Sequence, residues 1–320
     1  VSDTQSRWLM LNEGDHYDLA HFDFICREAA RLQDKYPALA PYIQVSFHCE
    51  TPEILRAYEH RIRTEAKLDG LKGYSAARPP HSEAIAISIV GAMAHAAGLK
   101  RVNILHITSR EAMDAALACR TAYPDVDFGF ETTAGHLLLD TDCAQGALAK
   151  VNPPIRSRAD VEYLWERVKD GTLEWVITDH ANCPLDQKVD AADPDNVWKA
   201  KAGFGGTEFL LPGIYSEATR RGLSPNRVAE LVSWVPSRRF GVLNKGDIAE
   251  GFDADLALLD PNETWTVRAA DSLSQQGYTP FEGLALKGRV KTTFLRGRKV
   301  FDGGKIAGGM SGRYLKRPCA

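Results

Sequence analysis

The chain has 320 residues, of which 44% are hydrophobic and 25% are charged. These ordinary values exclude a disordered or fibrous protein, and the length suits about two domains or one large barrel with an appendage. The 39 basic and 42 acidic residues leave a net charge of −3, which argues against nucleic acid or an anionic membrane surface as a partner. The sequence shows neither the roughly 18 apolar residues of a membrane helix nor a signal-peptide pattern, so we expect a soluble, cytoplasmic protein.

Six cysteines are scattered along the chain without a Cys-x-x-Cys pair, at positions 26, 49, 119, 143, 183 and 319. In a chain of this length, the pattern indicates reduced thiols, most of them small core residues, rather than a disulfide framework. No accompanying histidine and asparagine pattern marks any of them as a catalytic nucleophile.

Apolar runs of strand length alternate with segments of helical periodicity through most of the chain. This alternation is typical of βα units around a parallel sheet. The predicted strands cover residues 7–11, 42–47, 102–105, 126–130 and 173–178. Helices are predicted at 18–32, 52–66, 82–97 and after the N-cap Ser109, and a loop at 70–80. The expected fold class is α/β, a (β/α)8 barrel of the TIM type of which only about five strands are recognisable.

The pattern changes near residue 246. Short apolar strands separated by turns follow, at 256–259, at 264–267 and within 291–301. Such strands are typical of a small β structure attached to the barrel. We therefore predict a partial barrel over residues 1–245 and a β-sandwich portion over residues 246–320.

Three polar residues each follow a separate predicted strand: His48, His106 and Asp179. A (β/α)8 barrel places its chemistry at the carboxyl ends of its strands, so we expect these side chains to converge. Two imidazoles and one carboxylate are suitable ligands for a divalent metal ion, zinc above all. A single histidine of this kind is more often structural, but three residues on separate strands favour a metal site. A bound metal lowers the pKa of its water toward 7, which indicates hydrolytic chemistry.

Asp179 is suited to a second role, because a carboxylate beside the metal can take a proton from water and return it to a leaving nitrogen. His180 and Glu131 are either partners of the ligands or ordinary loop residues. The rigid Asn-Pro-Pro-Ile-Arg sequence either presents Asn152 to a ligand or stiffens a loop. The glycine-rich residues 203–206 have no strand before them, so we expect a turn over the barrel mouth rather than a phosphate-binding loop.

Several short motifs, in the same order along nearly the whole chain, resemble those of the cyclic amidohydrolases: dihydroorotase, allantoinase and hydantoinase. Phe47-His48-Cys49-Glu50 resembles one histidine strand end of that family, and Leu105-His106-Ile107-Thr108-Ser109 resembles another. The other motifs are Arg78-Pro79-Pro80, Asn152-Pro153-Pro154-Ile155-Arg156, Thr178-Asp179-His180, Gly203-Phe204-Gly205-Gly206, Lys245-Gly246-Asp247-Ile248-Ala249-Glu250-Gly251 and Pro280-Phe281-Glu282-Gly283. Their joint order makes the resemblance specific.

The resemblance implies a TIM barrel with a small β-sandwich built from both ends of the chain. It implies that His48 and His106 bind the more exposed metal ion, and that Asp179 binds the more buried one and acts as acid and base. The implied reaction is the reversible opening of a ring amide in a dihydropyrimidine, hydantoin or related ureide. The substrate-binding positions that it implies are Asn152, Phe204 and Gly205.

Two features of that family are absent from the sequence: a His-x-His pair, and a lysine that bridges two metal ions as a carbamate. Arg7 and Trp8 occupy the positions where the resemblance places that lysine. We therefore expect that the chain lacks an N-terminal portion or that another segment completes the barrel, which otherwise has two unpaired edges. The expected cofactor is zinc, one or two ions.

The substrate subclass stays open on the sequence. Cys183 stands where dihydroorotases commonly have a histidine, and this stretch, with Lys188 and residues 196–199, looks closer to allantoinase, whereas Leu11-Asn12-Glu13 leans toward dihydroorotase. The expected partner is a small cyclic amide, and the expected assembly is a homo-oligomer. The alternative to an enzyme is a non-catalytic relative that acts as a scaffold or assembly partner.

Overall fold

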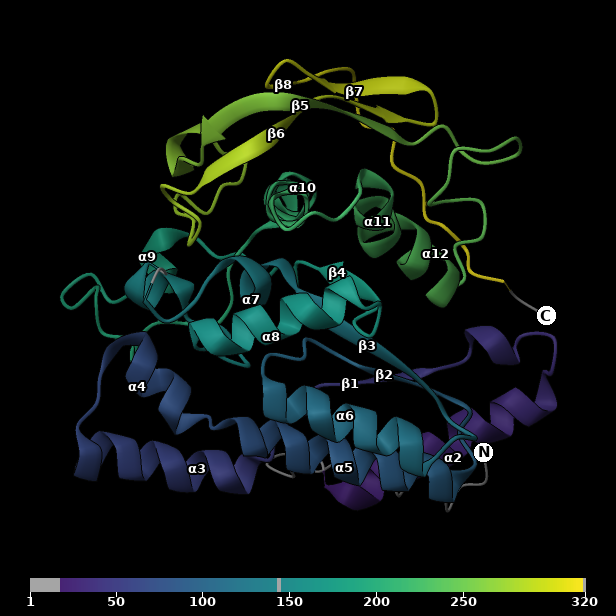
Figure 1. Ribbon diagram of the computed structural model, residues 1–320, viewed down its shortest axis with the longest axis vertical. Helices are drawn as coiled ribbons and strands as arrows, with labels where there is room; N and C mark the ends of the chain where they lie inside the picture. Colours follow the sequence, from purple (N-terminus) through teal and green to yellow (C-terminus); the bar gives the residue numbers. More distant parts are fainter. Residues whose placement is uncertain (1–17, 143–144, 319–320) are drawn as a thin grey trace.

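The structure is a computed structural model that describes residues 18–142 and 145–318. The strand predicted at 7–11, and with it Arg7 and Trp8, lies outside the described residues. The chain forms one parallel and one antiparallel sheet, which helices connect and cover (Figure 1). The α/β class predicted from the alternating pattern is therefore confirmed.

Four strands form the parallel sheet, in the order β1, β2, β3, β4. They are β1 (Val45–Phe47), β2 (Arg101–Ile104), β3 (Asp127–Thr133) and β4 (Trp175–Ile177). Val45 pairs with Val102, and Val102 pairs with Phe128. Because a helical segment returns the chain to the same end after each strand, neighbouring strands run parallel. The carboxyl ends of the strands therefore lie along the same edge of the sheet.

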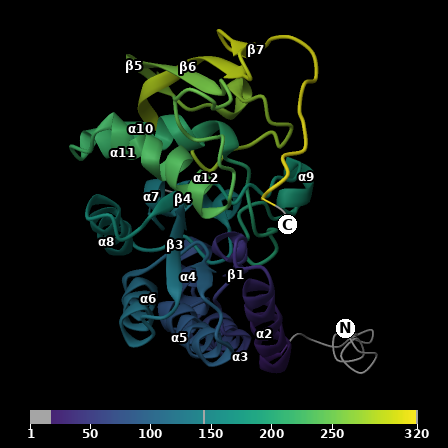
Figure 2. The ribbon, with the colours of Figure 1, turned by 90° about the vertical axis from the view of Figure 1, so that its right-hand side faces the viewer.

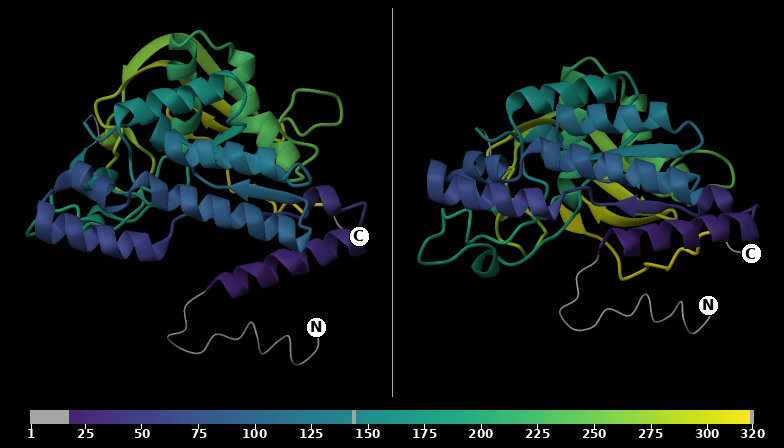
Figure 3. Two further views of the ribbon diagram at one scale, coloured as in Figure 1. Left: turned by 60° about the horizontal axis from the view of Figure 1, so that its bottom comes forward. Right: turned by 90° about the horizontal axis from the view of Figure 1, so that it is seen from below.

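Helices enclose the hydrophobic side of this sheet, and α5 and α6 pack against each other beneath the strands (Figures 1 and 3). The longer helices are α2 (Leu19–Lys35), α3 (Pro52–Arg61), α5 (Pro80–Ala97), α6 (Arg110–Ala122), α8 (Arg158–Lys169) and α10 (Leu210–Arg220). The shorter ones are α4 (Gly70–Ala77), α7 (Ala134–Leu138), α9 (Leu185–Lys188), α11 (Pro225–Ala229) and α12 (Val235–Arg239). Among the described residues, no helix combines the length and the apolar character that crossing a membrane requires.

Helical turns of other types complete the helical structure. The π-helical segment Ile62–Ala66 extends α3, and Glu230–Trp234 joins α11 to α12. The 3₁₀ turns are Ala40–Tyr42, Gly146–Ala149, Thr207–Phe209 and Ala269–Asp271. As predicted, Ser109 caps α6, since its Oγ accepts a hydrogen bond from the Ala112 amide at 3.2 Å.

The loop predicted at 70–80 is wrong, because α4 occupies most of it. Two glycines made the segment look like a loop, since glycine is a poor helix former. A Cβ on Gly73 would lie 2.7 Å from the Leu68 carbonyl carbon, so the helix needs glycine there to approach the preceding chain. The side chain of Asp69 accepts a hydrogen bond from the Gly70 amide at 2.7 Å and begins the helix.

The strand predicted at 126–130 is longer in the structure. β3 continues through Thr133, so Glu131 lies inside the strand rather than at its end. Glu131 pairs in register with Trp175 of β4, and this pairing extends the strand. Charged residues are rarely buried inside a strand, so the hydropathy pattern predicted that the strand ends before Glu131.

The antiparallel sheet has the order β5, β6, β7, β8, with α10 packed beneath β6 (Figures 1 and 2). Its strands are β5 (Leu256–Thr266), β6 (Ala285–Leu295), β7 (Arg298–Asp302) and β8 (Lys305–Ile306). The two strands predicted at 256–259 and 264–267 are one strand with a register shift between Asp260 and Thr264. Pro261 lies at this shift, and a proline has no N–H for the ladder. In the described residues the expected sandwich is thus represented by one sheet.

Candidate functional site

The carboxyl ends of β1 and β2 bring His48 and His106 together. The Nδ1 atom of His48 lies 2.5 Å from the Nε2 atom of His106, and the ring centroids are 4.7 Å apart. The two strands are hydrogen-bonded neighbours, so residues that follow their ends are held side by side. The pair that the sequence assigned to a metal is therefore assembled in the fold.

His106 is in a form that suits a metal ligand. Its side chain is buried, and burial lowers its pKa to about 3, with a smaller effect of His48 in the same direction. A neutral imidazole is the form that binds a divalent ion. Its Nδ1 atom is buried without a hydrogen-bond partner in the described part of the chain. The donor chemistry of the two rings therefore fits zinc.

Asp179 follows β4 but does not join the histidine pair. Among the described residues, no group of three His, Cys, Asp or Glu side chains converges closely enough to hold a metal ion. β1 and β4 are separated by two strands, and adjacent strands lie about 4.8 Å apart, so only a strongly curved sheet would bring their ends together. The structure thus unites two of the three predicted ligands.

His106 and Asp179 also share an unusual backbone. Their φ angles are 36° and 48°, in the left-handed region that non-glycine residues rarely adopt. Such backbone strain is retained where surrounding structure enforces it and is frequent at functional sites. The conformation turns each residue away from the direction of its strand.

Glu131 lies beneath His106 in the interior. Its carboxylate accepts hydrogen bonds from Trp175 Nε1 at 2.6 Å and from the His106 amide at 3.4 Å. The pKa of Glu131 is raised to about 7, mainly by burial and to a small extent by the charge of Asp179, while the two hydrogen bonds oppose the shift. Asp179 is therefore within electrostatic reach of the carboxylate that supports His106.

The loop that carries Asn152 is fixed from two sides. The Tyr74 hydroxyl donates a hydrogen bond to Asn152 Oδ1, and the Asn152–Pro153 peptide bond is cis. His136 Nε2 donates to the Pro153 carbonyl at 3.0 Å, and His136 Nδ1 accepts from the Thr133 hydroxyl at 2.8 Å. Burial lowers the pKa of His136 to about 4, so the neutral ring makes both bonds. This ring was not singled out by the sequence pattern.

The turn at 203–206 is anchored by Gln276, which the sequence pattern did not single out, and by Phe281 and His180. The Gly205 N–H donates to Gln276 Oε1 at 2.8 Å, and Gln276 Nε2 donates to the Gly205 carbonyl at 3.4 Å. Phe204 is buried and packs edge-on against Phe281, with ring centroids 5.9 Å apart. His180 Nδ1 accepts from the Gly206 amide at 3.2 Å. The backbone groups of Gly205 are thus already bonded within the chain.

Two ion pairs, one partly and one almost fully buried, support the same edge of the sheet. Arg78 forms two hydrogen bonds to Glu50, at 3.0 and 2.7 Å, two residues beyond His48. Deeper in the molecule, the Arg156 guanidinium pairs with Glu83, and both side chains are almost fully buried. Burial raises the pKa of Glu83, and the charge of Arg156 opposes that shift. These contacts hold the loops around the histidine pair.

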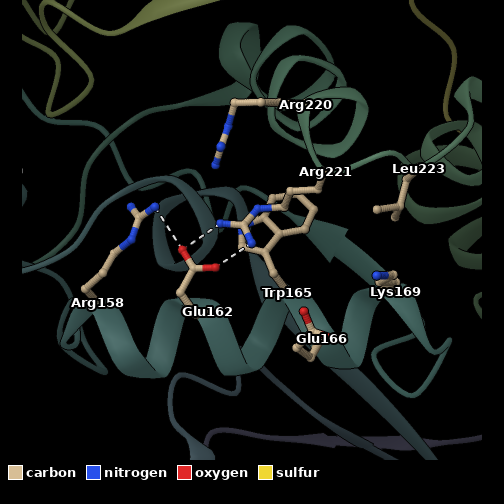
Figure 4. Close-up of a pocket in the computed structure, with 8 residues that line it drawn as sticks. All are labelled: Arg158, Glu162, Trp165, Glu166, Lys169, Arg220, Arg221 and Leu223. Carbon is tan, nitrogen blue, oxygen red and sulfur yellow. Dashed lines mark hydrogen bonds and ion pairs between the residues drawn. The ribbon is translucent and has the colours of Figure 1, made fainter.

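A separate surface cavity of about 340 Å³ lies between α8 and the end of α10 (Figure 4). Arg158 and Arg221 both bind the Glu162 carboxylate there, so these two cations are paired within the chain. None of the predicted site residues lines this cavity. Its lining residues are Arg158, Glu162, Trp165, Glu166, Lys169, Arg220, Arg221 and Leu223.

The sequence profile of the amidohydrolase family matches residues 41–300. The chain is 37% identical over 293 residues to an allantoinase of Rubrobacter xylanophilus, covering 91% of this chain and 61% of the relative. It is 34% identical over 296 residues to an allantoinase of Solibacter usitatus, covering 92% and 61%. The chain thus spans about three fifths of the length of these curated relatives.

The fold resembles solved hydantoinase structures. A D-hydantoinase from Bacillus sp. AR9 superposes with a TM-score of 0.82 at 25% identity, covering 97% of this chain and 67% of that one. The L-hydantoinase (dihydropyrimidinase) from Arthrobacter aurescens gives a TM-score of 0.82 at 27% identity, covering 92% and 62%. The predicted TIM-type α/β fold is therefore confirmed. Since the family profile matches most of its length, the chain belongs to the amidohydrolase family.

Proposed function

We propose that this chain functions as a metal-dependent hydrolase that opens a ring amide of a cyclic ureide or dihydropyrimidine. The observation that carries the proposal is the pair of imidazole nitrogens of His48 and His106, which face each other at 2.5 Å at adjacent strand ends. The similarity to allantoinases and hydantoinases indicates the class of bond. A small cyclic amide is accordingly the proposed substrate.

In this proposal, His48 and His106 would hold one zinc ion, and Asp179, which the described structure does not bring to the pair, would be a further ligand. Zinc would supply a water of lowered pKa and polarise the ring carbonyl. Asp179 takes a proton from the attacking water and delivers it to the leaving ring nitrogen. Glu131, which bonds the His106 amide, holds the strand end that presents His106.

The proposed substrate contacts come from the loop that carries Asn152 and from the turn at 203–206. Asn152 is held by Tyr74, so its amide nitrogen stays available to donate to a ring carbonyl. The turn around Phe204 and Gly205 is held by Gln276 and Phe281. Breaking of the ring C–N bond by water leaves a carboxylate and a free N–H on one product molecule, and the reverse reaction would use the same proton path.

Hydrolysis of a panel of cyclic amides tests the proposal. Allantoin, hydantoin and dihydroorotate are incubated with the zinc-loaded chain, and ring loss is followed by absorbance. We expect turnover of at least one compound above the zinc-only background, and a loss on the order of 100-fold or more in Asp179→Asn. His95→Asn, which removes an exposed histidine paired with Asp125, is the matched control and should keep full activity. Equal activity in Asp179→Asn would contradict the assigned mechanism.

A non-catalytic scaffold is the second candidate. It is favoured by one observation: within residues 18–142 and 145–318, no third ligand completes the histidine pair. This alternative predicts that the chain binds less than one zinc ion after dialysis and hydrolyses none of the three compounds. Elemental analysis on protein whose intact mass is verified separates the two candidates before any kinetics are measured.

A further inference from the structure

We infer that Lys188 is a positioning residue that locks together the two loops proposed to hold the substrate. The inference rests on the proposed function for the role of those loops, but its structural content stands on the contacts of Lys188 itself. Lys188 is the last residue of α9, and its side chain has no exposed surface. A lysine so fully enclosed is unusual, since lysine almost always keeps its ammonium in water.

The ammonium of Lys188 uses every donor that it has. Its Nζ donates to the carbonyl oxygen of Lys150 at 2.9 Å, of Lys201 at 2.7 Å and of Gly203 at 2.7 Å. An ammonium group carries three N–H donors, so the three carbonyls satisfy it completely. The acceptors belong to two segments that are about fifty residues apart in the sequence, one before the Asn152 loop and one at the glycine-rich turn.

These bonds belong to a larger connection between the loops. The Lys150 carbonyl also accepts from the Gly203 amide at 2.9 Å, so the two segments are joined directly as well as through Lys188. The Phe204 carbonyl accepts from the Ala181 amide at 3.2 Å, which links the turn to the strand end that carries Asp179. Gly203 has a φ of +100°, and a Cβ there would lie 2.9 Å from the Ala181 Cβ. The turn therefore packs closely against Ala181 at this point.

The surroundings of Lys188 show why a positioning role is the better explanation. Burial lowers the pKa of Lys188 to about 8, against an opposing effect of Cys183 and with a smaller effect of Lys150, and no carboxylate of the described residues contributes. Its charge is balanced by carbonyl dipoles and by the Tyr278 ring, whose centroid lies 5.9 Å from Nζ. Burying a charge without a counter-ion costs more free energy than burying an apolar side chain of similar size, so Lys188 does not serve merely to fill space. Its directional bonds, in contrast, specify one spacing of the two loops.

Hydrogen exchange tests this inference independently of catalysis. In Lys188→Met, amide exchange in residues 201–207 and 150–156 is expected to be at least about tenfold faster, the factor of one lost net hydrogen bond. Exchange in α6 should stay unchanged, because α6 does not contact Lys188. Lys199→Met is the matched control: it removes a half-exposed lysine of the same region that pairs with Asp190 and Asp193, and should behave as wild type.

Two results would overturn the positioning role. Either exchange at 201–207 is unchanged in Lys188→Met, or it accelerates equally in α6, which would mean that Lys188 only contributes global stability. If Lys188→Met does not fold, Lys188→Gln replaces it: an amide supplies two donors for the three carbonyls, and exchange at 201–207 should be intermediate.

A kinetic measurement connects the inference to the proposed function. With any cyclic amide that the wild type hydrolyses, Lys188→Met or Lys188→Gln should raise KM about tenfold or more while kcat changes much less, because the loops bind substrate and do not transfer protons. An unchanged KM in a variant with faster loop exchange would contradict the inference. If the wild type hydrolyses nothing, the proposed function fails, and the exchange experiment still decides whether Lys188 sets the loop spacing.

Discussion

Asp179 has a candidate catalytic side chain on a backbone conformation that is unfavourable for any residue other than glycine. Its φ of 48° costs a non-glycine residue about 1 kcal/mol or more relative to glycine. We therefore expect Asp179→Gly to be more stable than Asp179→Ala by about 1 kcal/mol in urea unfolding. At Asp114, inside α6, the order should be reversed, because alanine is the better helix former. Equal stabilities of the two variants at position 179 would mean that the backbone relaxes out of the left-handed region.

His136 predicts a pH dependence of stability. Its pKa is lowered by burial from 6.5 to about 4, so between these values the unfolded chain binds a proton that the folded chain does not. The free energy of unfolding should therefore fall as the pH decreases from 6.5 to 4, with no effect above 6.5. The lowered pKa of His136 corresponds to a loss of about 3 kcal/mol in the free energy of unfolding over this pH range.

The measurement compares urea unfolding of wild type and His136→Gln at several pH values. The variant should be less stable at pH 7, because it disturbs the bonds to Thr133 and Pro153, and should lose less stability on acidification. Parallel pH profiles of the two proteins would show that His136 is protonated in the folded state at the same pH as in the unfolded one.

Residues that end an apolar run could be found from the sequence, and residues that act through backbone groups could not. His48 and His106 were predicted because each follows the end of a predicted hydrophobic strand. Gln276 and Lys188 support the turn by bonding to peptide groups, which have the same chemistry in every residue. Gln276 is 71 positions from its partner, so no local spacing reveals the contact.

At the scale of single elements, the N-cap of α6 offers a quantitative test. Ser109 Oγ accepts from the Ala112 amide, which otherwise has no partner in the first turn. Ser109→Ala should lower the free energy of unfolding by about 1 kcal/mol. Ser88 of α5, whose hydroxyl donates back to the Ala84 carbonyl inside its own helix, is the matched control, and Ser88→Ala should be nearly neutral. A neutral Ser109→Ala would imply that water satisfies the Ala112 amide.

The buried pair of Glu83 and Arg156 joins elements that are distant in the sequence. Glu83 lies in α5, and Arg156 also donates to Thr108 Oγ1 at 3.0 Å and to the Arg78 carbonyl at 2.6 Å. Arg156→Met should destabilise the protein by about 3 to 5 kcal/mol, because it leaves a buried carboxylate unpaired. Adding Glu83→Gln should recover part of that loss, since the charge disappears with its partner.

A double-mutant cycle in urea checks the coupling. Arg27→Met is the control, because Arg27 is exposed and its pair with Asp23 should contribute at most about 1 kcal/mol. Additive effects of Arg156→Met and Glu83→Gln would mean that the two side chains stabilise the fold independently.

Element types were predicted well where the apolar period was regular, and less well where packing overrides propensity. The helices at α5 and α6 carry buried residues at helical spacing, and the sequence places both. α4 was missed because its Gly73 is selected for close approach to Leu68, not for helix formation. The separation of Asp179 from the histidines depends on the curvature of the whole sheet, and no local pattern encodes that curvature.

At the scale of the whole molecule, the two outer strands of the parallel sheet stand out. Within the described residues, β1 and β4 each have one neighbour, so each presents a row of backbone groups without a strand partner. Open edges pair readily with other strands. A further strand could pair there, either from a second copy or from the segment that we expect to complete the barrel. For the 320-residue chain by itself, we predict self-association through its parallel sheet.

Sedimentation equilibrium over a range of protein concentrations checks this prediction. The mass should be an integer multiple of that of one chain and should change little between low and high salt, because backbone hydrogen bonds between strands are screened far less than surface ion pairs. A mass that falls to that of one chain at high salt would instead indicate association through charged surfaces such as the arginine-rich cavity beside α8. A single-chain mass at every concentration would mean that the edges of β1 and β4 are covered within one chain, and self-association would then be excluded.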